Sequence, residues 1–289
     1  MRVSREELRH RAAETRSRLA HCDLCPRHCG VDRLRDERGY CGLGSEGRWY
    51  RELLHHGDEP DFSPGHLLNF AGCNLRCAHC SEGKFVDDPS ADGSRELNIE
   101  TMATLVARRR SQGARSLVLA GGNPDVQLPT ILELLAACPQ DTFVVWNSNL
   151  WINEENLTAL RGVVDLQLPD FKYGNDGCAR RIADAPHYVD VLRDNLTILR
   201  EQEVPVLVRH LLLPGHFECC TRPILTWLRR DFPAAAVNLM TVYLPFDRLN
   251  RRHTSPSKPL EEKERNRAIS LLRELSFPDA RVDGDPFRD

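Results

Sequence analysis

The sequence lacks any hydrophobic run of about 18 residues, the length that a membrane-spanning helix needs. It begins with a charged stretch, Met1–Glu7, that has the character of a helix start rather than a signal peptide. Lysine is scarce, since Lys84, Lys172, Lys258 and Lys263 are the only lysines among 39 basic residues. With a net charge of −3 there is no excess of positive charge to bind nucleic acid or an anionic membrane. We therefore expect a cytoplasmic protein with neither nucleic acid nor a membrane as its partner.

What the sequence has in abundance is cysteine, with 11 in 289 residues. In the reducing compartment expected here, so many cysteines indicate metal binding rather than disulfides. The hydrophobic content of 41% is ordinary for a globular protein. The length allows one large α/β domain with a small appendage, or two domains.

Three cysteines lie within eight residues in the stretch Gly72–Cys80, at Cys73, Cys77 and Cys80. Thiolates are the ligands that iron–sulfur clusters select, and three of them hold three corners of a [4Fe–4S] cube. The fourth iron then stays open to a small molecule. The alternatives are a zinc site or ordinary buried cysteines, but zinc takes four ligands and usually C-x2-C pairs.

This C-x3-C-x2-C motif, placed after the apolar run 67–71, resembles that of the radical S-adenosylmethionine (SAM) enzymes. The resemblance implies that the open iron binds the amino and carboxylate groups of SAM. An electron then splits the sulfonium into methionine and a 5′-deoxyadenosyl radical, which takes a hydrogen atom from a substrate. The residue before the last cysteine, commonly aromatic in the family and near the adenine, is His79 here, and an imidazole can also stack.

A second group of cysteines precedes the motif, with the spacing C-x2-C-x3-C-x11-C at Cys22, Cys25, Cys29 and Cys41. Its segment is rich in glycine and arginine and has little apolar content to form a hydrophobic core. A bound metal would therefore stabilise its fold in place of a core. Zinc and a [4Fe–4S] cluster both accept four thiolates, and the spacing leaves the two open. Unliganded cysteines are the third alternative.

Apolar runs alternate with helical patterns through the rest of the chain. The predicted strands are 67–71, 116–120, 142–146, 163–168, 204–213 and 237–243. A capped helix is expected from Ser4 to about Ala20. Such alternation predicts parallel βαβ units in an α/β fold, and the resemblance implies a (β/α)6 partial TIM barrel. We expect an N-terminal helix and four-cysteine segment (1–62), the barrel (63–250) and a C-terminal helix with a polar tail (251–289).

Ligands of parallel α/β folds bind at the carboxyl ends of the strands. The residues there that the resemblance assigns to SAM are Gly121, Gly122, Asn123, Asn147, Asn149, Asp170, Lys172 and Arg209, in addition to His79. The glycines let the backbone approach a ligand closely. An anion and a cation two residues apart on an extended chain suit a zwitterion. Ordinary turns and a structural ion pair are the alternatives.

Cys178, Cys219 and Cys220 also fall in loops on the predicted ligand face. They are candidates to contact substrate, to relay a hydrogen atom or to bind another metal. They can equally be small buried residues at helix starts.

The stretches 168–176 and 209–216, with the N-terminal cysteines, are similar to the pyruvate formate-lyase activating-enzyme-like branch of radical SAM proteins. That branch implies hydrogen abstraction from a protein or peptide, with a glycyl radical in a partner enzyme as one outcome, and a flavodoxin- or ferredoxin-type electron donor. The alternatives are radical modification of a small metabolite and a non-catalytic iron–sulfur or zinc assembly factor.

Overall fold

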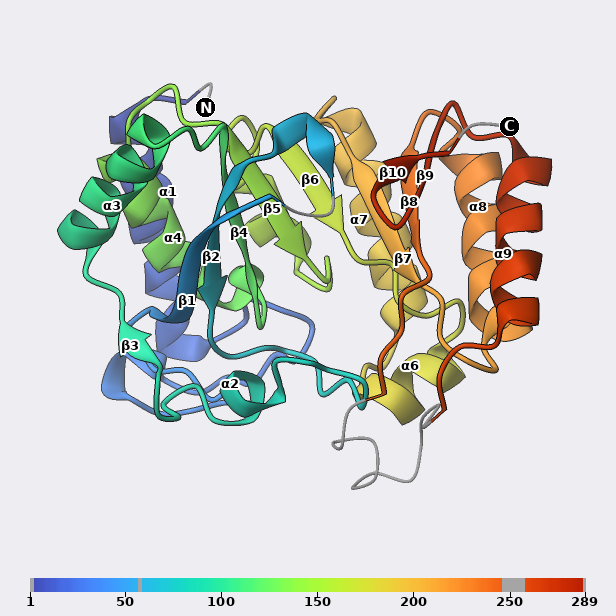
Figure 1. The fold of residues 1–289 in the computed structure, drawn as a ribbon. Helices are drawn as coiled ribbons and strands as arrows, with labels where there is room; N and C mark the ends of the chain where they lie inside the picture. Colours follow the sequence, from blue (N-terminus) through green and yellow to red (C-terminus); the bar gives the residue numbers. More distant parts are fainter. Residues whose placement is uncertain (1–2, 57–58, 246–257, 288–289) are drawn as a thin grey trace. The chain divides into compact units, whose positions relative to one another are not determined.

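A computed structural model describes residues 3–56, 59–245 and 258–287 (Figure 1). By contact, the chain divides into two compact units. Unit 1 comprises Met1–Asn74, Glu82–Gln167 and Gln202–Pro205, and unit 2 comprises Leu75–Ser81, Leu168–Glu201 and Val206–Asp289. The cysteine motif therefore begins in unit 1 and ends in unit 2. The boundaries at residues 62 and 250 stay a prediction, and residue 250 lies outside the described residues.

A mixed sheet forms the centre of unit 1. Its strand order is β3 (Arg95–Glu96), β1 (Arg48–His55), β2 (Gly65–Phe70), β4 (Ser116–Gly121), β5 (Val144–Ser148) and β6 (Leu166–Pro169), whose last two residues belong to unit 2. The pairs β2–β4 and β4–β5 are parallel, as predicted. The sequence analysis missed β1, which pairs antiparallel with both β2 and β3.

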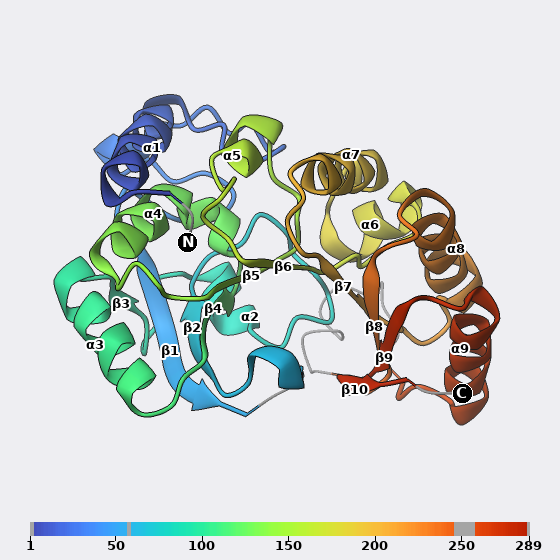
Figure 2. The ribbon, with the colours of Figure 1, turned by 90° about the horizontal axis from the view of Figure 1, so that it is seen from above.

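Helices cover the sheet of unit 1, which explains why the strand β4 is apolar along nearly its whole length and buried. They are α1 (Arg5–Ser17), α2 (Gly83–Asp87), α3 (Ile99–Ser111), α4 (Leu128–Ala137) and α5 (Glu154–Thr158). The helix α1 packs against α4 (Figure 2). It begins at the predicted cap, where the Ser4 hydroxyl accepts a hydrogen bond from the Glu7 amide at 3.1 Å. It ends at Ser17, and the turn Arg18–His21 is a 3₁₀ helix.

Unit 2 has its own sheet, in the order β10 (Asp285–Pro286), β9 (Asp279–Val282), β8 (Ala236–Met240) and β7 (Leu207–Leu211). The predicted pair β7–β8 is parallel. The expected polar tail instead contributes β9, which extends the sheet parallel to β8. The helices are α6 (Asp176–Ala183), α7 (Tyr188–Glu201), α8 (Arg222–Asp231) and α9 (Glu262–Leu275), with α8 against α9 (Figure 1).

One turn of unit 2 has an unusual backbone. A π-helical turn, Phe217–Thr221, leads directly into α8, and such turns are frequent at functional sites.

Among the described residues, none of the helices has both the length and the apolar character that crossing a bilayer requires.

Candidate functional site

In unit 1, the start of the cysteine motif is held by a buried network of amides. Asn74 is fully buried, and its Oδ1 accepts hydrogen bonds from Asn123 Nδ2 at 2.9 Å and from Asn149 Nδ2 at 2.8 Å. Asn149 Nδ2 also lies 3.7 Å from the sulfur of Cys73. The structure thus brings the predicted Asn123 and Asn149 together around Cys73, through an asparagine to which the sequence analysis gave no role.

The paired glycines after β4 permit a close approach of two chain segments. A Cβ on Gly122 would lie 2.2 Å from the carbonyl oxygen of Gly72, and one on Gly121 would lie 2.5 Å from the amide nitrogen of Phe70. Gly121 also has φ +108°, which side chains rarely adopt. These glycines therefore allow the chain after β4 to lie close to the segment that leads into the cysteine motif. Asn147 lies half-buried near the end of β5.

Asp125 is a buried carboxyl in this network that the sequence analysis missed. Trp146 donates its indole N–H to Asp125 Oδ1 at 2.7 Å, and Asn123 Nδ2 lies 3.2 Å from Oδ2. Burial raises the pKa of Asp125 to about 6, against these hydrogen bonds, which lower it. The Oδ1 of Asn123 is buried without a hydrogen-bond partner in the described part of the chain. Such an orphaned acceptor is suited to a ligand that donates a hydrogen bond.

In unit 2, the rest of the motif is pinned to the carboxyl end of α6. Arg76 donates its amide to the carbonyl of Ala183 at 2.9 Å, and Ala78 donates to Ile182 at 2.8 Å. These bonds fix the loop that carries Cys77 and Cys80, of which Cys77 is buried.

His79 lies in the same loop, edge-on to the ring of Tyr173 at a centroid distance of 6.2 Å. Its Nδ1 is buried and has no hydrogen-bond partner among the residues described. Desolvation, with a smaller contribution from the Lys172 charge, lowers the pKa of His79 to about 3. The ring is therefore neutral near pH 7, which suits stacking and hydrogen bonding rather than binding of an anion.

The three predicted charged residues of unit 2 form one group. Lys172 Nζ lies 2.6 Å from Asp170 Oδ2, and Arg209 Nε lies 3.9 Å from Asp170 Oδ1. Burial alone would raise the pKa of Asp170, but the charges of Lys172 and Arg209 outweigh it and lower the pKa. Arg209 also lies against the sulfur of Met240 at 3.2 Å. The structure thus places one anion between two cations.

The four N-terminal cysteines come together in unit 1. Cys22, Cys25, Cys29 and Cys41 all line one small cavity. Burial, followed by the nearby thiols, raises the pKa of Cys25 to about 12 when no metal is bound. Arg33 is buried beside them, with a guanidinium nitrogen 3.9 Å from the Cys22 sulfur, and its positive charge suits a site of several thiolates.

This cavity adjoins the start of the cysteine motif within unit 1. Asn74 lines the cavity, and the Arg27 guanidinium donates to the Asn74 carbonyl at 3.0 Å. A Cβ on Gly72 would lie 2.9 Å from the carbonyl oxygen of Cys41. The segment of the N-terminal cysteines therefore packs against Gly72 and Asn74, the two neighbours of Cys73, a proximity that spacing in the sequence does not reveal.

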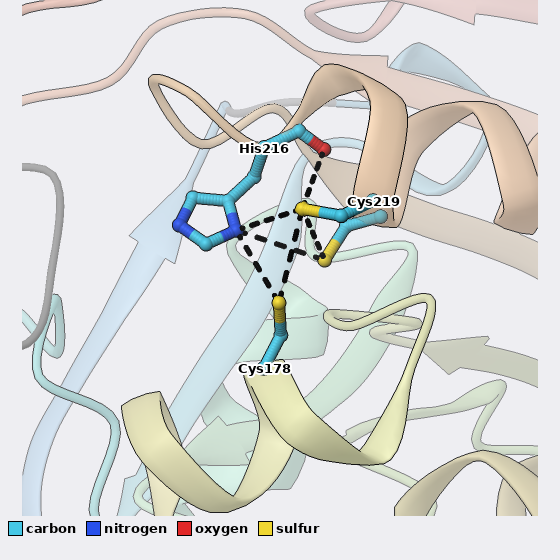
Figure 3. Close-up of side chains that lie close together, drawn as sticks. Cys178, His216 and Cys219 are labelled. Atoms are coloured by element: carbon cyan, nitrogen blue, oxygen red, sulfur yellow. Dashed lines mark hydrogen bonds between the residues drawn. The ribbon is translucent and has the colours of Figure 1, made fainter.

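The last three candidate cysteines also meet in unit 2. Cys178 from α6 and Cys219 from the π-helical turn have their sulfurs 3.8 Å apart, and Cys220 lies 3.9 Å from Cys219 (Figure 3). The Nδ1 of His216 lies 3.6 Å from Cys178. The sequence analysis gave His216 no role, and its spacing of three from Cys219 was the available signal.

Comparisons with known proteins define the class. The family model of the radical SAM superfamily matches residues 70–228, more than half of the chain. An uncharacterized protein, MJ0674 of Methanocaldococcus jannaschii, is 32% identical over 244 residues, covering 81% of this chain and 71% of that one. The chain belongs to the radical SAM superfamily.

Solved structures agree on the fold. Streptococcus suis SuiB bound to SAM is similar with a TM-score of 0.52 at 10% identity, over 73% of this chain and 47% of SuiB. The hydrogenase maturase HydG of Carboxydothermus hydrogenoformans has a TM-score of 0.51 at 13% identity, over 70% of this chain and 49% of HydG. The chain thus spans about half the length of these structures. The predicted α/β fold is confirmed, and the cofactors of the family are a [4Fe–4S] cluster and SAM.

Proposed function

We propose that the chain is a radical SAM enzyme whose cluster is held by Cys73, Cys77 and Cys80 and whose substrate is a protein or peptide. The observation that carries the proposal is the three-cysteine motif of one short segment, with its first sulfur positioned by Asn149 and Asn74. When bound, the cluster and SAM supply an electron and a 5′-deoxyadenosyl radical that abstracts hydrogen.

The chain's own residues fit those cofactors chemically. Three thiolates leave one iron of a [4Fe–4S] cluster without a protein ligand. The Asp170 carboxylate suits the ammonium of the methionyl group of SAM, and the Arg209 guanidinium suits its carboxylate. The neutral ring of His79 suits the adenine. The buried, unpartnered acceptor of Asn123 suits a donor group of the same nucleotide.

The remaining predicted contacts stay part of the proposal. Gly121, Gly122, Asn147 and Asn149 would contact SAM, and Lys172 would neutralise Asp170 or the SAM carboxylate. A flavodoxin- or ferredoxin-type protein would deliver the electron. Cys22, Cys25, Cys29 and Cys41 would hold a second metal centre, close enough to Cys73 to pass that electron on if the centre is redox-active.

Two considerations favour a protein or peptide target over a metabolite. The motifs around Asp170 and Arg209 resemble those of the activating-enzyme-like branch. In addition, SuiB, which shares the fold, has been solved with its precursor peptide SuiA.

Deuterium transfer tests the target class. The anaerobically reconstituted, reduced protein is incubated with SAM and with extract from the source organism grown in D₂O, separated into macromolecular and low-mass fractions. Because the radical takes its hydrogen from the substrate, we expect deuterated 5′-deoxyadenosine with the macromolecular fraction. Deuterium from the low-mass fraction alone would establish a metabolite target instead. A total lack of 5′-deoxyadenosine in cluster-loaded protein would remove the enzymatic function itself.

A further inference from the structure

Four potential metal ligands converge in unit 2, away from the cysteine motif in sequence. The sulfurs of Cys178, Cys219 and Cys220 and a ring nitrogen of His216 all lie within 4.8 Å of one another. Figure 3 shows the imidazole of His216 and the sulfurs of Cys178 and Cys219 turned toward a common centre. They come from two elements, since Cys178 lies in the first turn of α6, while Cys219 and Cys220 belong to the π-helical turn before α8 and His216 caps that turn.

The spacing of these atoms is that of the ligands around one tetrahedral ion. Zinc–sulfur bonds of about 2.3 Å and zinc–nitrogen bonds of about 2.0 Å at tetrahedral angles place sulfurs about 3.8 Å apart, and sulfur about 3.6 Å from nitrogen. The structure has sulfur pairs at 3.8 and 3.9 Å. The His216 Nδ1 lies 3.6, 3.3 and 3.9 Å from the sulfurs of Cys178, Cys219 and Cys220. We propose that these four residues form a Cys₃His site for one structural zinc ion.

The surroundings of the site suit thiolates rather than thiols. Asn175 Nδ2 lies 3.3 Å and Arg181 Nη2 3.5 Å from the Cys178 sulfur. Three thiolates and a neutral imidazole on Zn²⁺ leave a net charge of −1, which the Arg181 guanidinium offsets. Cys178 also lies in the first turn of α6, where the helix dipole favours negative charge. N–H donors and a cation of this kind are the outer partners that metal ligands usually have.

Close backbone contacts join the two segments that carry the four ligands. A Cβ on Gly174 would lie 2.6 Å from the carbonyl oxygen of Cys220 and 2.7 Å from its Cα, so only glycine lets the loop after β6 reach the π-helical turn. Asn175 ties the same loop to the carbonyl of Cys219 at 2.7 Å. From the other side, the Glu264 carboxylate accepts from the Gly215 amide at 2.9 Å. The ion would therefore join the loop that follows Asp170 and Lys172 to the turn that follows Arg209.

A zinc ion explains these four side chains better than a disulfide or an iron ion does. A disulfide needs sulfurs about 2.05 Å apart, but Cys219 and Cys220 are 3.9 Å apart. Four protein ligands complete a tetrahedron, which is the closed arrangement of structural zinc, and thiolates with imidazole bind Zn²⁺ more tightly than Fe²⁺. Binding exchanges three thiol protons for one Zn²⁺ without any change of oxidation state. The three cysteines are then ligands and do not serve as hydrogen-atom donors.

Metal analysis of the anaerobically purified full-length protein tests the site. We expect Cys219→Ala to lose about one zinc ion per chain relative to wild type, with the iron content unchanged. The matched control is Cys138→Ala, which removes a buried cysteine outside every cysteine group described above and keeps the zinc. Unchanged zinc in Cys219→Ala, or loss of iron in its place, would overturn the proposal.

A ligand exchange guards against a variant that simply fails to fold. His216→Cys offers four sulfurs, so zinc should be retained while X-ray absorption at the zinc edge shows one nitrogen at about 2.0 Å replaced by sulfur at about 2.3 Å. Thiol alkylation gives an independent measure on the wild type, in which we expect Cys178, Cys219 and Cys220 to react only after zinc is chelated. A zinc spectrum that does not change in His216→Cys, or free alkylation of the zinc-loaded protein, would contradict the site.

Discussion

The strand ends of the two units use different chemistry. In unit 1 the side chains around Cys73 are neutral amides, and the one carboxyl among them, Asp125, has a pKa raised to about 6 by burial. In unit 2 the carboxyl of Asp170 lies between Lys172 and Arg209, and its pKa is lowered. The two aspartates show how partners shift a pKa, because a buried carboxyl without a cation beside it takes up a proton at a higher pH than one that lies between two cations. The described groups around Cys73 in unit 1 are therefore mainly neutral hydrogen-bonding groups, whereas Asp170, Lys172 and Arg209 in unit 2 form a group of charges.

The two units also differ in their groups of cysteines. In unit 2 the ligand atoms of Cys178, His216, Cys219 and Cys220 are compact enough for a single ion. The four N-terminal cysteines line a cavity in unit 1, and four thiolates can hold either a zinc ion or a [4Fe–4S] cluster. A [4Fe–4S] cube binds each thiolate to a different iron and so holds its thiolates farther apart than one ion does. Because the N-terminal cavity adjoins the start of the cysteine motif, where a second cluster could relay electrons, we expect a cluster at the N-terminal site and propose zinc in unit 2.

The largest effect is expected from Cys25→Ala. Its segment has little apolar surface to bury, so loss of the metal should lower the free energy of unfolding by at least about 3 kcal/mol. We expect about four iron per chain to be lost while zinc stays, measured by metal analysis and by the urea midpoint. Loss of zinc instead of iron would show that both sites hold single ions and would end the contrast between them.

The protonation of Asp125 should appear as a pH dependence of stability. Its pKa is near 3.8 unfolded and about 6 folded, so between these values the folded state binds more protons. Stability should therefore fall as pH rises from about 4 to about 6, by up to about 3 kcal/mol, and stay level above that. Urea unfolding of wild type and Asp125→Asn across this range measures the difference, which should vanish at low pH. Parallel curves for the two proteins would mean that Asp125 stays ionised.

Asp170→Asn tests the charged group of unit 2. Removing the anion leaves no partner for the SAM ammonium, which should weaken SAM binding by about 10- to 100-fold, equivalent to about 1.5–3 kcal/mol. Equilibrium binding of SAM to the cluster-loaded protein measures this. The matched control is Asp141→Asn, which neutralises an exposed aspartate paired with Arg110 and should bind SAM as wild type does. Equal affinities for the two variants would assign Asp170 a structural ion pair only.

Gly174→Ala is expected to have an effect no larger than that of Asp170→Asn. The added methyl group would collide with the backbone of Cys220, so the turn must shift without loss of any ligand. We expect zinc affinity to fall by about 10- to 100-fold, as for other changes next to metal ligands. Competition with a chromophoric chelator measures it. Affinity equal to wild type would show that the ion does not depend on this close approach.

Much of the fold could be predicted, because strand and helix patterns depend on local periodicity. The run that became β4 is apolar along nearly its whole length, as buried parallel strands are. The antiparallel strand β1 and the C-terminal strand β9 were missed, since both are only half-buried and carry no continuous apolar signal.

The candidate site was predictable where its ligands are close in sequence or lie at strand ends. Cys73, Asp170 and Asn149 became candidates in this way, and their roles stay predictions. Asn74 and Asp125 were missed because their roles come from hydrogen bonds across the unit rather than from a motif. His216 was missed because its partner Cys178 lies 38 residues away in the chain and only the fold brings them together.

The central claim is that Cys73, Cys77 and Cys80 hold a cluster at which SAM is cleaved, and single-turnover product analysis tests it most directly. Cluster-loaded wild type and Cys138→Ala, reduced anaerobically with SAM, should both form 5′-deoxyadenosine, and Cys77→Ala should form none. Equal yields from Cys77→Ala and wild type, or no product from cluster-loaded wild type, would contradict the account.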